Sequence, residues 1–164
     1  MVEKKDKENE YDMITEYNKL REKFTLPEYK PLADDFDIEK LNEKESDFLL
    51  REIRRAIGEK IASYMHLFEL LLNPSSPPLF LFPILNSMSK ETKEKINSMY
   101  KVFSKFQIES MKLDTIYEEK SEAEYITKIF NEWQNLKKEI YKIIETFEGN
   151  IKENEEERKG GYFG

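Results

Sequence analysis

Seven apolar residues in the last third of the chain recur at alternating steps of three and four positions. They share one face of a helix in a 3.5-residue repeat, which is typical of helices that pack side by side with a left-handed supercoil. Other apolar residues flank this face and make it wider than the seam of a two-stranded coiled coil, so a multi-helix core is predicted. The repeat consists of Ile126, Ile129, Trp133, Leu136, Ile140, Ile143 and Phe147.

Two other long segments, residues 46–72 and 89–113, carry apolar faces at helical spacing, and residues 11–24 form a shorter one. No strand-like alternation persists anywhere. We therefore expect an all-α fold, an up-and-down helical bundle of three long helices plus a shorter N-terminal helix. Gly58 lies inside the first long helix, where the close approach of a neighbouring helix would offset its cost of about 1 kcal/mol.

The length of 164 residues fits one domain. Residues 1–10 are charged and almost devoid of apolar side chains, and we expect a disordered N-terminal tail. Residues 11–148 are expected to form the helical bundle domain, and residues 149–164 a polar C-terminal tail with a terminal aromatic motif. Within the bundle, residues 25–37 contain two prolines and are predicted to be a connecting segment.

The composition excludes several classes of function. The chain has no cysteine and a single histidine, His66, so thiol chemistry, triad chemistry and zinc–thiolate sites lack their usual residues. Neither phosphate-binding glycine loops nor a nucleophile elbow is present. We expect no enzyme activity, no catalytic residues, no cofactor and no metal. A net charge of −7 disfavours nucleic acid as the main partner.

The location of the protein is also constrained by its sequence. The N-terminus is charged and is followed by no apolar signal core, and the longest apolar run, residues 79–85, is too short to span a bilayer. A cytoplasmic protein without membrane contact is expected. The excess of Lys and Glu, with only two Gln, is found in thermophile proteins and also follows from A/T-rich coding.

Arg51, Arg54 and Arg55 are three of only five arginines in the chain. Arginine is favoured over lysine where a planar fork must grip a carboxylate or a phosphate, so the cluster is a candidate anion or partner contact. The alternative is structural pairing, with Glu52, Glu59 or the acidic segment 34–37.

Two apolar features are candidate partner-binding sites. The run 79–85 includes Leu79, Phe80 and Phe82, which either form an exposed patch for a partner or plug one end of the bundle. Tyr162 and Phe163 follow a highly charged stretch. They are interpreted as a motif that docks on a partner, as a segment that packs back onto the domain, or as a cloning remnant.

Two family resemblances involve the arginine helix. Residues 49–60 resemble the Arg-Arg helix of cobalamin adenosyltransferases, but the nucleotide loop expected near that family's N-terminus is missing, so no activity is carried over. Residues 14–106 are loosely similar in order to the helical domain of archaeal GINS replication subunits, with Asp35-Phe36 at a turn and Met88 opening a later helix. That family's small β-domain is absent. This resemblance implies an accessory role in replication.

The sequence thus favours a non-enzymatic helical protein-interaction or scaffold module. Its partner would be another protein or a second copy of the chain, for example in a homodimer. The alternative is an accessory subunit in nucleic-acid processing that contacts phosphates through an Arg/Lys patch. Residues 90–112 carry a local net charge of +3 and add lysines to such a patch.

Overall fold

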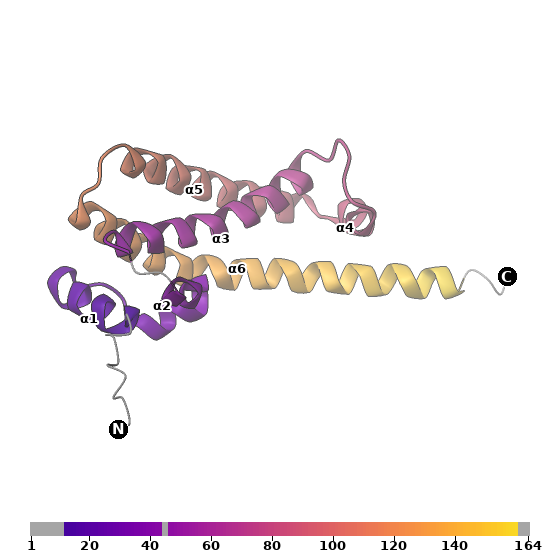
Figure 1. Ribbon diagram of the computed structural model, residues 1–164. Helices are drawn as coiled ribbons and strands as arrows, with labels where there is room; N and C mark the ends of the chain where they lie inside the picture. The colour runs from indigo at the N-terminus through magenta and orange to yellow at the C-terminus, as the bar shows by residue number, and fades with distance from the viewer. Residues whose placement is uncertain (1–11, 44–45, 161–164) are drawn as a thin grey trace, which may run out of the picture.

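The computed structural model describes residues 12–43 and 46–160, and every regular element in those ranges is helical (Figure 1). The predicted all-α class is confirmed. Three long helices and a shorter N-terminal helix form its main body, as expected. The elements are α1 Met13–Phe24, α2 Tyr29–Phe36, the 3-10 helix η1 Ile38–Glu43, α3 Leu49–Leu72, the 3-10 helix η2 Leu79–Leu81, α4 Phe82–Ser87, α5 Lys90–Thr115 and α6 Glu119–Gly160.

The three long helices α3, α5 and α6 pack along one another (Figure 1). The shorter helices α1 and α2 lie against the first half of this bundle, near the start of α6. At the opposite end, η2 and α4 close the connection between α3 and α5, and α4 packs on α6. The last turns of α6 continue past α4, whereas Ile140, Ile143 and Phe147 in its second half are buried in the bundle (Figure 1).

The apolar stripes predicted from the sequence form the core. In α6 every residue of the seven-residue repeat is buried except Leu136, which is half-buried. The stripe of α3 is buried at Leu50, Ile53, Ile57 and Ile61. Each such side chain contributes about 1.5–3 kcal/mol relative to full exposure, so these stripes account for most of the attraction between the helices.

Aromatic rings fill the centre of the bundle. Phe68 of α3 and Phe103 of α5 stack with their centroids 5.9 Å apart. Trp133 of α6 lies 5.6 Å from the ring of Tyr64 and 5.4 Å from that of Phe36, so α2 is tied to the same cluster. The indole Nε1 of Trp133 is buried without a hydrogen-bond partner in the described residues.

The helix α2 corrects the prediction of a connecting segment at residues 25–37. Pro31 falls in the first turn of α2, where backbone N–H groups have no intrahelical acceptor, so the proline costs no helical hydrogen bond. Leu32 and Phe36 are buried and anchor the helix. It ends at Phe36, and its C-cap Asp37 has a left-handed φ of 55° and donates its N–H to the Ala33 carbonyl at 2.8 Å.

Gly58 does not mark a close helix contact, contrary to the expectation. A Cβ built on this glycine would meet no atom within 4 Å. Its carbonyl accepts a hydrogen bond of 3.0 Å from the Gln107 side chain of α5, which any residue at this position would preserve. The glycine therefore carries its helix-propensity cost without a packing gain.

The long helices begin and end close to their predicted positions. Ser89 caps α5 by accepting from the Thr92 N–H at 3.1 Å. The helix α6 continues through Gly160, beyond the expected domain boundary at residue 148. The predicted tail 1–10 lies outside the described residues. No helix of the described part is long and apolar enough to cross a membrane.

Candidate interaction surfaces and the arginine cluster

Arg54 is buried in the bundle and not at its surface. Its Nε donates to the Glu122 carboxylate of α6 at 2.6 Å. Its Nη1 donates to the Ser110 hydroxyl at 2.5 Å and to the Ser110 carbonyl at 3.1 Å, and its Nη2 donates to Asp114 at 2.6 Å. Arg54 therefore links α3 to both α5 and α6. Every nitrogen of its guanidinium is engaged within the protein.

The network keeps its charges paired. Burial alone would lower the pKa of Arg54, but the hydrogen bonds to Asp114 and Glu122 outweigh it and raise that pKa above its ordinary value. The hydrogen bond from Arg54 also lowers the pKa of Asp114. Removal of one partner of a buried ion pair destabilises the fold strongly, because the other partner remains as an uncompensated buried charge.

The other two arginines also have protein partners. Arg51 donates to the Leu113 carbonyl at 3.3 Å, and its guanidinium carbon lies 4.8 Å from the centroid of the Tyr117 ring. Arg55 is half-exposed and pairs with Glu52 at 3.4 Å, a partner that the sequence indicated. Arg54 and Arg51 thus form hydrogen bonds with groups of α5 and α6, which leaves few of their N–H groups available to a phosphate.

Sequence reasoning missed the principal partners of Arg54, although a signal was present. Glu122 lies four residues before Ile126, on the continuation of the heptad face, and it is fully buried. Ser110 fills a slot of the α5 stripe, and Arg54 is four residues after the buried Leu50 of α3. Polar residues at core positions of three neighbouring helices are expected to form hydrogen bonds with one another, because buried polar groups need partners.

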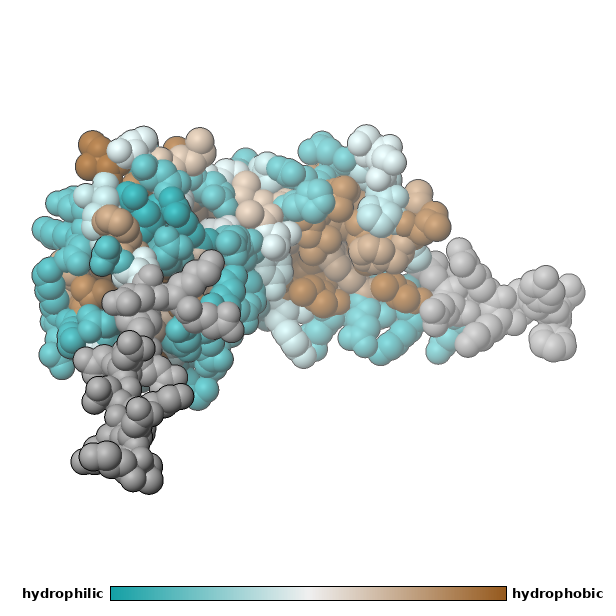
Figure 2. Space-filling view, in the orientation of Figure 1, coloured by the Kyte–Doolittle hydropathy of each residue, from teal (hydrophilic) through white to brown (hydrophobic). Residues whose placement is uncertain are grey.

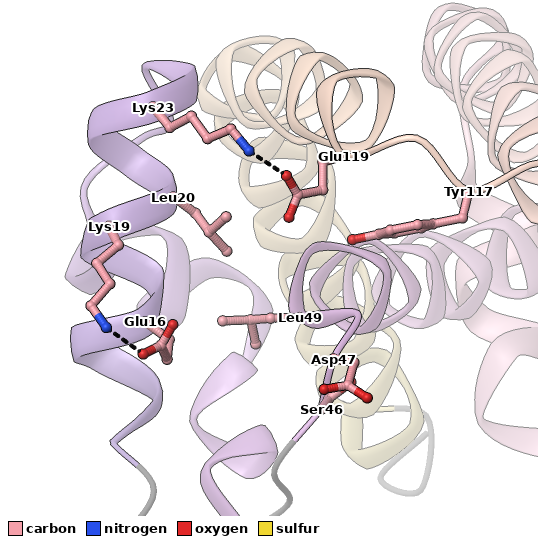
Figure 3. A pocket seen from close by; sticks show the side chains of 9 residues that line it. All are labelled: Glu16, Lys19, Leu20, Lys23, Ser46, Asp47, Leu49, Tyr117 and Glu119. Atoms are coloured by element: carbon pink, nitrogen blue, oxygen red, sulfur yellow. Dashed lines mark hydrogen bonds and ion pairs between the residues drawn. The ribbon is translucent and has the colours of Figure 1, made fainter.

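A polar hollow of about 350 Å³ lies between α1, the turn before α3 and the start of α6 (Figure 3). Both of its lysines are paired with carboxylates: Lys19 with Glu16 and Lys23 with Glu119, each at 2.6 Å. Leu20, Leu49 and Tyr117 line the rest together with Ser46 and Asp47. This lining contains no histidine, and both of its lysines are paired with carboxylates.

The described part of the chain contains one histidine, His66, and many Asp and Glu side chains. No group of three or more His, Cys, Asp or Glu side chains there is arranged to hold a metal ion. His66 is exposed on α3, away from the hollow and from the arginine network.

The segment 79–84 presents an apolar surface at the α4 end of the bundle. Leu79, Phe80 and Phe82 are 85%, 65% and 45% exposed, and we call these three residues the apical surface. Leu81 and Ile84, between and beside them, are buried and anchor the segment. Apolar residues are seen to gather over α4 and the second half of α6 in Figure 2. The run is therefore a plug on one side and an exposed patch on the other.

A groove adjoins the apical surface. Phe82 and Leu85 of α4 line it together with Leu71 and Leu72 from the end of α3. Lys93 of α5 stands on the same groove and forms no ion pair within the described residues. Pro74, Ser75, Ser76, Pro77 and Asn86 complete the lining. The groove therefore combines apolar and polar groups with one lysine that forms no ion pair.

A second exposed apolar feature lies on α6. Tyr141 and Ile144 are 63% and 44% exposed, although Ile140 and Ile143 beside them are buried. The remaining candidate residues, Tyr162 and Phe163, lie outside the described residues.

No family model matches this chain, and no curated protein or solved structure is significantly similar to it. The function must therefore be argued from the surfaces of the chain itself.

Proposed function

We propose that the protein is a non-enzymatic helical interaction module that docks a protein partner on its apical surface. The observation that carries this proposal is the exposure of Leu79, Phe80 and Phe82 within six residues whose other large apolar side chains are buried. Contiguous exposed apolar residues on a folded domain are characteristic of interaction sites.

The groove beside the apical surface indicates the chemistry of the partner. Leu72, Phe82 and Leu85 would contact apolar side chains, Ser75, Ser76 and Asn86 offer polar contacts beside them, and Lys93 would attract a carboxylate. We infer that the partner presents a short apolar segment, such as one turn of an amphipathic helix, with an acidic residue beside it. Docking of this segment would cover the phenyl rings of Phe80 and Phe82.

The alternative role as a nucleic-acid accessory subunit gains less support from the geometry. All three guanidinium nitrogens of Arg54 donate hydrogen bonds to protein groups. Arg51 donates a hydrogen bond to the Leu113 carbonyl, and its guanidinium lies over the Tyr117 ring. Phe103, which lies among the lysines of α5, is fully buried and cannot stack on a base.

Site-specific photocrosslinking tests the proposal. A photoreactive phenylalanine analogue would be placed at residue 80 or, as a matched control, at residue 116, because Ile116 is 75% exposed at the far end of α5. We expect residue 80, and not residue 116, to crosslink to one protein in the cells that produce the chain. That protein, once purified, should bind the unmodified chain and be displaced by Leu79→Ser/Phe80→Ser. Equal crosslinking at both positions would overturn the proposal. So would a partner that binds Leu79→Ser/Phe80→Ser as tightly as it binds the unmodified chain.

A further inference from the structure

One side of α6 is covered near its middle and exposed one turn further on. Asp35, in α2, accepts from Gln134 at 2.8 Å and from Lys137 at 2.9 Å, so α2 lies against this side of α6. Tyr141 and Ile144 follow Lys137 at steps of four and three, which places them on the same side. Both side chains are exposed, because α2 does not extend to them.

The charges along this exposed side are arranged in an order that complements itself. Lys138 precedes Tyr141, whereas Glu145 and Glu148 follow Ile144. Neither Lys138 nor Glu145 forms a salt bridge within the described residues. The Glu145 carboxylate accepts a hydrogen bond from the Tyr141 hydroxyl, and Glu148 pairs with the exposed Lys152. Two such helices placed antiparallel would bring the positive end of each beside the negative end of the other. Parallel helices would bring like charges together.

We propose that a second copy of the chain docks on this side of α6, antiparallel and about a two-fold axis between Tyr141 and Glu145. Such an interface is isologous, so every contact occurs twice. Lys138 of each copy faces Glu145 or Glu148 of the other, and Tyr141 and Ile144 of both copies lie at the centre. Tyr141 and Ile144 are exposed on the side of α6 that faces away from the buried Ile140 and Ile143, which leaves this approach open.

This dimer is separate from the proposed docking of a protein partner on the apical surface. Leu79, Phe80 and Phe82 belong to η2 and α4, and none of them is part of the antiparallel pairing. Either surface can therefore fail its test without affecting the other.

Charge reversal tests the proposal through the molar mass measured by light scattering after size exclusion, over a concentration series. The full chain should be a dimer. Lys138→Glu and the double variant Glu145→Lys/Glu148→Lys should each dimerise at least about tenfold more weakly, because like charges then face each other. An equimolar mixture of the two variants should restore a dimer, since every contact is again attractive. A monomeric full chain, or dimers that persist in both variants, would overturn the proposal.

Cysteine pairing tests the orientation of the helices independently. The chain contains no cysteine, so an introduced thiol has no competitor. A mixture of Lys138→Cys chains with Glu145→Cys or Glu148→Cys chains should form a disulfide between unlike chains under mild oxidation. Lys138→Cys alone should form none, because the two copies of residue 138 are far apart in the antiparallel pair. Crosslinking of Lys138→Cys to itself, or of no combination, would contradict the antiparallel dimer.

Discussion

Replacement of Glu122 by leucine should destabilise the bundle strongly, because it leaves Arg54 as a buried and partly unpaired charge. The side chains of Arg54 and Glu122 are 1% and 0% exposed, and the atoms that join them are 2.6 Å apart. Removal of one partner of such a pair costs about 3–5 kcal/mol. Since Arg54 keeps its hydrogen bonds to Asp114 and Ser110, we expect a loss near the lower end, about 3 kcal/mol.

The loss would be measured by urea unfolding followed by circular dichroism. At the size of this chain, each kcal/mol lowers Tm by about 2–4 °C, so the variant should melt about 6–12 °C below the parent. Lys23→Ala provides a matched control, because it breaks the Lys23–Glu119 pair of the same length at an exposed position. Its effect should stay within about 0.5 kcal/mol.

A double substitution separates the cost of an orphaned charge from the value of the pair. Arg54→Met/Glu122→Leu removes both charges and replaces them with apolar side chains of similar size. The double variant should regain most of the stability that Glu122→Leu loses, because a buried pair and a well-packed apolar pair are often close in free energy. A loss below about 1 kcal/mol for Glu122→Leu, or a double variant less stable than the single one, would refute the reasoning.

Three further predictions concern the same fold. The hydrogen bond from Arg54 lowers the pKa of Asp114 from its usual 3.8, so its stabilising effect is present above that pH and is lost as the pH falls through the folded-state pKa. The difference in urea midpoint between the parent and Asp114→Asn should therefore be constant from neutral pH to about 4 and shrink below it. Gly58→Ala should raise the free energy of unfolding by about 0.5–1 kcal/mol in the same assay, since the added Cβ meets no atom. Leu32→Ala should lower the free energy of unfolding by about 2–5 kcal/mol if α2 belongs to the core, and a negligible loss would show that it does not.

The periodic part of the fold could be predicted from sequence because burial follows helical spacing. The heptad face of α6 and the stripe of α3 are buried as expected, and Ser89 caps α5. The helix α2 was not predicted, because the rule that proline ends a helix does not apply to Pro31 in a first turn. The C-terminal extent of α6 was also missed, since polar residues continue a helix without any apolar periodicity.

The candidate sites depended on contacts between helices, which single-helix patterns do not specify. Arg54 was recognised as unusual, but its partners Glu122 and Asp114 are more than fifty residues away in sequence and became neighbours only when three helices packed. The run 79–85 contains both exposed and buried residues because the helical turns of η2 and α4 direct Leu81 and Ile84, three residues apart, toward the core. Leu81 is buried for this reason, whereas Phe80 is exposed.

The affinity of the partner crosslinked from residue 80 tests the central claim most directly. Calorimetric titration would compare the full chain with Leu79→Ser/Phe80→Ser and with Ile116→Ser, which removes an equally exposed apolar side chain at the opposite end. We predict that the apical double variant binds at least about tenfold more weakly, because burial of each large apolar side chain contributes about 1.5–3 kcal/mol, while Ile116→Ser binds as the parent does. Equal affinities for all three proteins would contradict the assignment of the apical surface as the docking site.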